Sequence, residues 1–240
     1  DTVGELHVLA DASHTAIATA LAAKGGLGLA ASGTVADAVV DTRVSATIGD
    51  DARIEVARTV EVDANSAGSA RADATGINVS LGGAVGASIA TATMSPTVSA
   101  TIGQRSLIDA TDFTLAAHQA LPASGGRSAF ASASGAAGGL LVGANASRST
   151  ALNDAAVNAK VGDDSTLKIS DTATVRTDNT HSQLAYVSGV SAGFVAIGAN
   201  TASASSNTDS HAALGDHVKV EGGTLNVLAD GQATNHAYGV

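Results

Sequence analysis

The hexapeptide Val44-Ser45-Ala46-Thr47-Ile48-Gly49 occurs twice in this chain. The second copy, at residues 98–103, is identical and lies 54 residues later. Diverged copies at residues 157–162 and 210–215 also end in glycine, so the four glycines are spaced 54, 59 and 53 residues apart. A period of this size is typical of repeat proteins whose units stack on one another.

Residues at a fixed distance from these glycines are alike in all four repeats. The apolar ones lie one residue before the glycine, eleven before it and five after it: Ile48, Ile102, Val161 and Leu214; Ala38, Ala92, Ala151 and Ala204; Ile54, Ile108, Leu167 and Val220. A second series of segments starts at Leu6, Val60, Phe113, Ala173 and Leu225. Apolar and polar residues alternate in both series, and a period of two with many β-branched residues predicts β-strands.

Three turns are expected in each repeat, because Asp, Asn, Ser and Gly recur at matching places. One precedes the hexapeptide (41–43, 95–97, 153–154 and 207–209), and one follows the glycine (49–51, 103–105, 162–164 and 215–217). A third follows the second series, at 65–68, 124–126, 178–180 and 230–232. The glycine that begins the second turn predicts a backbone angle that favours glycine there. The Gly- and Ala-rich remainder of each repeat predicts flat strands packed closely against another sheet.

Repeats with turns in register can stack as parallel strands about 4.8 Å apart. The sequence therefore predicts an all-β fold, a parallel β-solenoid (β-helix) of about four ~54-residue repeats in a single array. The repeats run at about 1–54, 55–108, 109–167 and 168–220, and a fifth begins at 221–240. We expect this array to be a fragment of a longer chain. Each repeat forms either one wide coil or two coils of about 27 residues, and the different compositions of its halves favour the wide coil.

Composition excludes several classes of protein. Hydrophobic residues make up 45% of the 240 residues but aromatics only 2%, so the core must be thin. The regular Val and Ile positions and the presence of only two prolines argue against disorder. A net charge of −10 argues against nucleic-acid partners and against docking on anionic membranes. No apolar run is long enough for a membrane-spanning helix. Without cysteine, the repeats must be held together by stacking rather than by disulfides.

No catalytic constellation is recognisable, and the sequence predicts a protein that is not an enzyme. None of the seven histidines forms an HxH or HExxH pair, so they are interpreted as scattered surface residues: His7, His14, His118, His181, His211, His217 and His236. The serines lack the G-x-S-x-G elbow, and the glycine clusters lack the Lys-Ser/Thr ending of a phosphate loop.

Calcium is the one candidate cofactor, because carboxylates gather at the second turn and calcium prefers oxygen ligands. These carboxylates belong to Asp50, Asp51, Asp163, Asp164 and Asp216. The glycine-aspartate nonapeptide of calcium-binding β-rolls is absent, and Gln104 and Arg105 interrupt the acidic column. Two residues after each glycine the charge alternates, in Asp51, Arg105, Asp164 and His217. These are either opposite charges that attract mildly up the stack or solvated turn residues.

The whole repeat resembles those of large repetitive secreted adhesins of Gram-negative bacteria. The resemblance lies in a Gly/Ala/Val stretch, then Val-x-Ala-x-Ile-Gly-Asp, then alternating strands such as Ile54-Glu55-Val56 and Val60-Glu61-Val62-Asp63-Ala64. Leukotoxin-type filamentous adhesins are the most similar, and filamentous-haemagglutinin-like β-solenoids are more distant. The resemblance covers the whole chain, although each motif is short. It implies a secreted protein of the cell surface or the extracellular (biofilm) matrix, and it carries over no catalytic residue and no receptor site.

The expected function is therefore structural: a self-stacking, non-catalytic segment of an extracellular filament or adhesin stalk. Its expected partners are neighbouring repeats, further copies that associate into fibres, and surface glycans. The alternative is a polysaccharide- or calcium-binding solenoid module of a surface or matrix protein. A β-helical carbohydrate-active enzyme is disfavoured, because neither aromatic platforms nor cleft carboxylates are recognisable.

Overall fold

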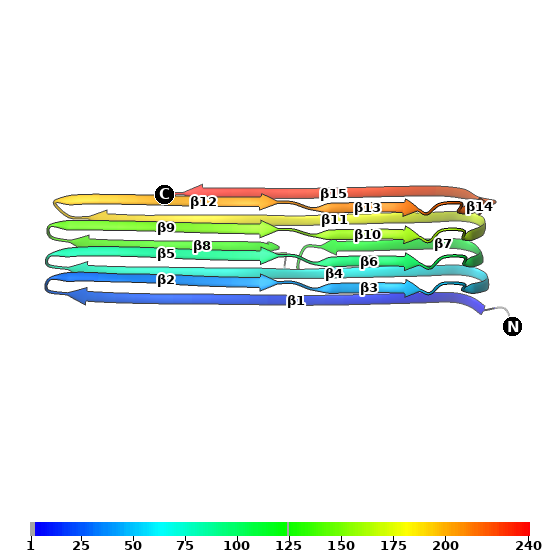
Figure 1. Cartoon of the computed structure of the whole chain (residues 1–240), viewed down its shortest axis with the longest axis horizontal. Helices are drawn as coiled ribbons and strands as arrows, with labels where there is room; N and C mark the ends of the chain where they lie inside the picture. Colours follow the sequence, from blue (N-terminus) through cyan, green and yellow to red (C-terminus); the bar gives the residue numbers. More distant parts are fainter. Residues whose placement is uncertain (1–2, 124) are drawn as a thin grey trace.

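A computed structural model describes residues 3–123 and 125–240 of the chain. This part consists of strands and turns, and it contains no helix that is long and apolar enough to cross a membrane. The chain winds into four flat coils that stack on one another, with the beginning of a fifth (Figure 1). All strand pairs between coils are parallel, so the prediction of an all-β parallel β-solenoid is confirmed.

Each coil consists of one long strand followed by two shorter ones. Coil 1 contains β1 (Val3–Gly26), β2 (Leu29–Val40) and β3 (Arg43–Ile48), and coil 2 contains β4 (Arg53–Ser80), β5 (Gly83–Met94) and β6 (Thr97–Ile102). In coil 3 the long strand is divided into β7 (Leu107–Ala120) and β8 (Ala129–Gly139), which β9 (Val142–Asn153) and β10 (Ala156–Val161) follow. Coil 4 contains β11 (Thr166–Ala192), β12 (Val195–Ser206) and β13 (Asp209–Leu214), and β14 (Lys219–Glu221) and β15 (Thr224–Gly239) begin the fifth.

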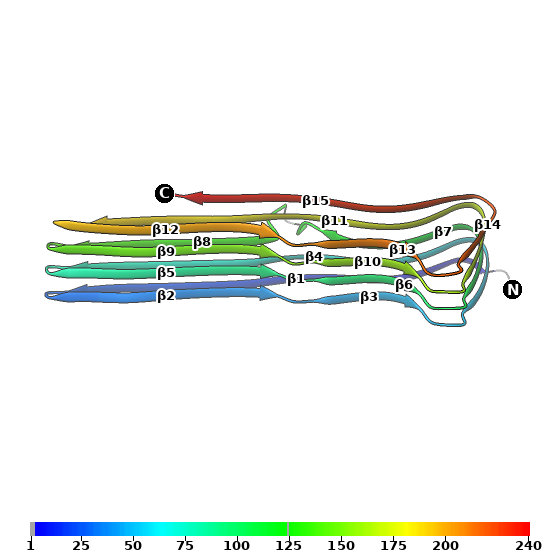
Figure 2. The same cartoon turned by 45° about the horizontal axis from the view of Figure 1, so that its top comes forward.

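Equivalent strands form three sheets. Sheet A contains the long strands in the order β1-β4-β7-β11-β14, with β8 between β4 and β11 and with β15 paired to β11. Sheet B has the order β12-β9-β5-β2 and sheet C the order β13-β10-β6-β3. Sheets B and C lie end to end and together cover sheet A, as the turned view shows (Figure 2). Val44 pairs with Val98 in the next coil, 54 residues later, so each repeat is one wide coil rather than two narrow ones.

The interior is divided into a thick half and a thin half. Between sheet C and the facing part of sheet A lie large side chains such as Ile108, Phe113 and Leu115. Between sheet B and sheet A the buried residues are mostly alanines, such as Ala72, Ala92 and Ala131. Small side chains let two sheets approach closely. Half of each coil therefore has a thin core lined by alanine, and this core contains few aromatic residues.

The predicted third turn is wrong in three of its four copies. Residues 65–68 lie inside β4, 178–180 inside β11 and 230–232 inside β15. Asn, Asp and Gly favour turns locally, but here neighbouring strands pair with them and hold them extended. Only the copy in coil 3 leaves the sheet, and Ser124 of that copy lies outside the described residues. The predicted turn before the hexapeptide is confirmed at 41–42, 95–96, 154–155 and 207–208.

The extra length of the third repeat is a loop that interrupts sheet A. Ala67 of coil 2 pairs with Ala120 of coil 3, and Ala70 pairs with Ala129. Three steps along β4 (70 − 67) therefore correspond to nine steps along coil 3 (129 − 120), and the loop takes up the six extra residues. Pairing resumes at Ala129 with both neighbours, so the break stays local to coil 3.

Candidate functional sites at the anchor turn and at the break in sheet A

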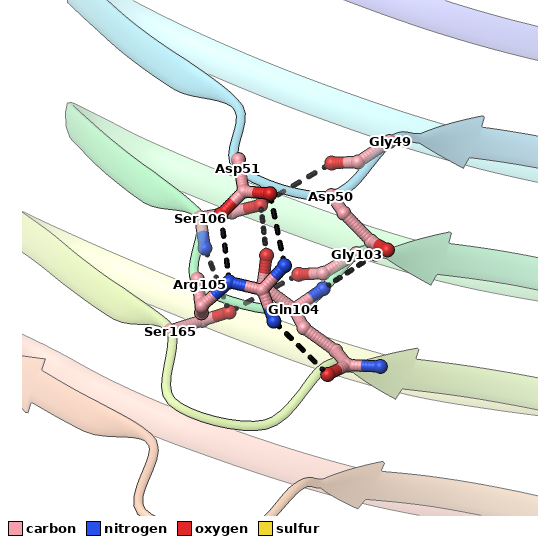
Figure 3. A network of polar contacts seen from close by, with 8 residues as sticks. All are labelled: Gly49, Asp50, Asp51, Gly103, Gln104, Arg105, Ser106 and Ser165. Carbon is pink, nitrogen blue, oxygen red and sulfur yellow. Dashed lines mark hydrogen bonds and ion pairs between the residues drawn. The ribbon is translucent and has the colours of Figure 1, made fainter.

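The anchor turn is the name used here for the four residues that begin with the repeated glycine: 49–52, 103–106, 162–165 and 215–218. In each coil this turn lies over the equivalent turn of the previous coil, and Figure 3 shows the contact between the first two. The carboxylate of Asp50 accepts a hydrogen bond from the backbone N–H of Gln104 at 2.9 Å. Asp163 accepts one from the N–H of Asp216 at 3.0 Å. These two carboxylates each join their turn to the next coil.

Opposite charges meet along the same column. Nε and Nη2 of Arg105 donate to the two carboxylate oxygens of Asp51 at 2.7 and 2.9 Å (Figure 3). The hydrogen bond with Arg105 lowers the pKa of Asp51, and in turn the carboxylate raises the pKa of Arg105. Two coils further on, Nδ1 of His217 lies 3.5 Å from Oδ1 of Asp164. All four side chains are exposed, so each pair contributes little to stability.

The backbone angle predicted for the glycine occurs two residues later instead. The repeated glycines are not among the residues with positive φ, whereas φ is 53–58° at Arg105, Asp51, His217 and Asp164. This left-handed conformation turns the N–H of Asp51 towards the carbonyl of Gln104 in the next coil, at 2.8 Å. The N–H of Arg105 likewise reaches the carbonyl of Asp163 at 2.9 Å. The strained residue therefore provides a backbone hydrogen bond between coils.

Gly103, Gly162 and Gly215 are required by the close approach of neighbouring turns. A Cβ placed on Gly103 would collide with the backbone of Gly49 and Asp50. A Cβ on Gly162 would lie 2.6 Å from the carbonyl carbon of Gly103, which is shorter than real Cβ contacts. Ser106 and Ser165 complete the contact, because their hydroxyls donate to the carbonyls of the glycine one coil below, at 3.3 and 3.1 Å.

Calcium binding at the acidic turns stays a prediction. Within residues 3–123 and 125–240, no three His, Cys, Asp or Glu side chains form a group that could hold a metal ion. Asp50, Asp51, Asp163 and Asp164 instead have partners within the protein, as the preceding contacts show.

A second candidate site is a groove on the outer face of sheet A, which we name the break groove. It lies beside the end of β7, where the long strand of coil 3 is interrupted, and has a volume of about 580 Å³. Strands β4, β7 and β11 and the first loop residue line it, through Asp63, Asn65, His118, Gln119, Ala120, Leu121, Arg176, Asp178 and Thr180. Three successive coils thus contribute to one site.

An imidazole between two carboxylates forms the mouth of this groove. Nδ1 of His118 lies 2.8 Å from Oδ2 of Asp178, and its Nε2 lies 3.5 Å from Oδ1 of Asp63. Nη2 of Arg176 is 3.1 Å from the same Asp178 oxygen. Burial raises the pKa of Asp63, and the nearby His118 partly opposes this shift. The mouth therefore presents acceptors and donors together with charges of both signs.

Interpreting all histidines as scattered surface residues was wrong for two of them. The side chain of His118 is 18% exposed and belongs to the ion-pair network. His181 is only 2% exposed, and burial lowers its pKa. The sequence signal that pointed to this region was the spacing of 59 residues in the third repeat, where the others have 54 and 53.

Comparison of the chain with protein-family models, curated proteins and solved structures gives no match. A functional assignment therefore rests on the geometry of the stacked coils and of the break groove.

Proposed function

We propose that this chain is a structural, non-catalytic segment of an extracellular filament or adhesin stalk. The observation that carries the proposal is the register of sheet C, where each inward side chain lies on its own equivalent in every coil. In one such column Ala46, Ala100, Ala159 and Ala212 follow one another. A coil of this kind buries its inner face only against its neighbours, and each added coil lengthens the stack by about 4.8 Å.

Growth of the stack is supported by the way in which equivalent strands pair in sheet C. The N–H groups of Thr97 and Gly103 bond to the coil before them. A further coil, from the same chain or from another copy, could meet the equivalent groups of β3 in the same way. A copy stacked head to tail would place its His217 beside Asp51, so the alternation of charge would continue.

Lateral association is supported by an apolar edge, formed by the turns between sheets A and B. It presents exposed Leu27, Leu81, Leu140, Leu141 and Phe194. The surrounding residues 81–87, 138–144 and 192–198 carry no charge. Large exposed apolar patches on soluble proteins are associated with interaction surfaces, and this patch repeats from coil to coil along the filament axis.

Electron microscopy and fibre diffraction of the purified chain test the proposal. We expect rods longer than four coils, with a reflection near 4.8 Å along the rod axis. The variant Ser45→Pro removes one N–H from the free edge of β3, where proline is tolerated, and is expected to shorten the rods while the coil stays folded. Ser99→Pro is the matched change one coil further in, where it removes a hydrogen bond of the sheet and unfolds the segment. Particles that remain single at every concentration contradict self-association.

The proposed location at the cell surface or in the extracellular matrix rests on the resemblance of the repeat to secreted adhesins. Antibody labelling of intact cells that express the full protein tests it. Labelling without permeabilisation is expected, and labelling only after permeabilisation contradicts the proposal.

A further inference from the structure

The loop in coil 3 brings two arginines to one groove on the outer face of sheet A, which we name the arginine groove. Arg71 belongs to β4, and Arg127 is the last loop residue but one before β8. The groove has a volume of about 280 Å³ and is also lined by Ser69, Ala70, Pro122, Gly126 and Phe130. None of these seven residues is acidic. Two cations therefore share a small site in a chain whose net charge is −10.

Contacts within the protein hold the guanidinium of Arg71. Its Nε donates to Oδ2 of Asp73 at 2.6 Å. Its Cζ lies 4.8 Å from the centroid of the Phe130 ring, which is within the range of a cation–π contact. An arginine has five N–H groups, and the bond to Asp73 uses one of them. The side chain of Arg71 is 55% exposed, so the guanidinium remains accessible to a ligand.

The end of the loop holds Arg127 in a similar way. Nη1 of Arg127 donates to Oγ of Ser182 in β11 at 3.2 Å. The next residue, Ser128, is fully buried. Its N–H donates to the carbonyl of Ser182, and its carbonyl accepts from the N–H of Ala70 in β4. Cations that are already held in place lose less side-chain entropy when a ligand binds than mobile ones do.

Stacking of the repeats does not require this pair of arginines. The residues that pair with Arg71 in the neighbouring coils are Ile17 and Phe130, and Leu184 follows in coil 4. Arg127 lies in the loop that takes up the extra length of coil 3. The groove is therefore not a feature that repeats from coil to coil, and it occurs where the repeat is broken.

Arg53 provides a comparison within the same strand. Like Arg71, it is followed two residues later by a carboxylate. Its Nε and Nη2 both donate to Oε1 of Glu55, at 3.1 and 2.6 Å, whereas the bond from Arg71 to Asp73 uses Nε. Pairing with the neighbouring carboxylate thus occupies more of the guanidinium in Arg53 than in Arg71.

We propose that the arginine groove binds a small organic carboxylate. The guanidinium fork matches the two oxygens of a carboxylate, and hydrogen bonds between such charged groups are among the strong ones in proteins. Phe130, Pro122 and Ala70 add apolar surface, which the carbon atoms of an organic ligand can contact. The volume is just below the range of about 300–1,000 Å³ for drug-sized ligands, so the groove suits a ligand as small as a sugar acid.

NMR titration of the whole chain tests this site with glucuronate and with glucose, which has the same ring but no carboxylate. We expect glucuronate to shift the signals of Gly126 and Arg127, with a dissociation constant in the millimolar range, and glucose to leave them unchanged. Arg127→Gln removes one cation from the groove and is expected to weaken binding by at least about fivefold. Arg71→Gln removes the other cation and is expected to have a similar effect.

Arg53→Gln is the matched control. It removes an arginine that is paired in the same way in the same strand, and it is expected to leave binding unchanged. Inorganic sulfate is titrated alongside, and sulfate that binds as tightly as glucuronate would overturn the assignment of an organic ligand. The site is refuted if glucuronate does not bind, if glucose binds equally well, if binding survives both Arg127→Gln and Arg71→Gln, or if Arg53→Gln weakens it as much as they do.

This site does not depend on the proposed filament. None of the residues that line the arginine groove belongs to β3 or to the apolar edge. Rods are therefore expected to form in Arg127→Gln as in the unchanged chain. Loss of rods in Ser45→Pro, in turn, is expected to leave the binding of glucuronate intact.

Discussion

Gly103 lies so close to the backbone of Gly49 that no side chain fits between the two turns. Gly138, inside β8 of coil 3, differs from it, because a Cβ built on Gly138 meets nothing within 4 Å. This difference offers a measurement of how tightly the coils are packed.

We expect Gly103→Ala to lower the free energy of unfolding by about 1–3 kcal/mol, the usual cost of overpacking. Gly138→Ala is the control and is expected to lower it by no more than about 0.5 kcal/mol. Chemical denaturation measures both. Equal effects in the two variants would show that glycine is needed for its backbone conformation rather than for the close contact between coils.

A second prediction follows from the residue of the anchor turn that has a left-handed backbone conformation. Asp164 has a φ of 58°, a conformation that glycine adopts without strain and β-branched residues adopt at a high cost. Asp164→Val is expected to destabilise the fold by about 1–3 kcal/mol, and Asp164→Gly is expected to be neutral or stabilising. Thermal melts of the two variants at one pH provide the comparison. A milder effect of valine than of glycine would contradict the assigned conformation.

Buried His181 predicts a dependence of stability on pH. Burial lowers its pKa, so below its ordinary value of 6.5 the unfolded chain binds more protons than the folded one. The free energy of unfolding is therefore expected to fall as the pH is lowered from 7 through 6.5 and towards the folded-state pKa. Denaturation at pH 7 and pH 5 measures the change.

The control for this pH effect is His181→Gln, which keeps a polar side chain but cannot titrate. His7 acts in the opposite direction, because its hydrogen bond with Glu61 raises its pKa, but it does so in both proteins. The unchanged chain should therefore lose more stability on acidification than His181→Gln does. Equal losses would mean that His181 does not titrate within this range.

The apolar edge predicts that lateral bundling of the rods can be abolished without a loss of stability. Leu140 and Phe194 are 70% and 92% exposed at this edge, so replacing both by Asp should leave the core undisturbed. The variant is expected to form single rods instead of lateral bundles, with stability within about 0.5 kcal/mol of the unchanged chain. Electron microscopy counts bundles, and Leu152→Ala on the outer face of sheet B serves as a control. If bundles persist in the variant, the rods must contact one another through another face.

Sequence periodicity was sufficient to predict the architecture, because in a solenoid the contact between coils is a contact between equivalent positions. Ala38, Ala92, Ala151 and Ala204 were aligned by their distance from a glycine, and each is paired with the next in sheet B. Where the local turn propensity disagreed with the pairing between coils, the pairing determined the structure. Residues 65–68, which contain Asn and Gly, therefore stay extended inside β4.

The candidate sites were less accessible to sequence reasoning. The break groove draws Asp63, His118 and Asp178 from three coils, and these residues are 55 and 60 positions apart (118 − 63 and 178 − 118). They do not belong to one aligned column, since Asp63 pairs with Ala116 rather than with His118. The turn between sheets A and B was missed for a different reason. Its glycines, such as Gly82 and Gly139, occur in a Gly/Ala-rich segment that looked like one flat strand.

The loop in coil 3 leaves the pairing at Ala129 intact on both sides, so a change of length in one coil does not propagate to its neighbours. A gene encoding such an array can thus gain or lose residues in one repeat while the others remain unaltered. The same property makes the loop between β7 and β8, before the buried Ser128, a natural place to graft a foreign peptide. Because each coil has a fixed height, the grafted peptide would be displayed at a position along the fibre that is set by the choice of repeat.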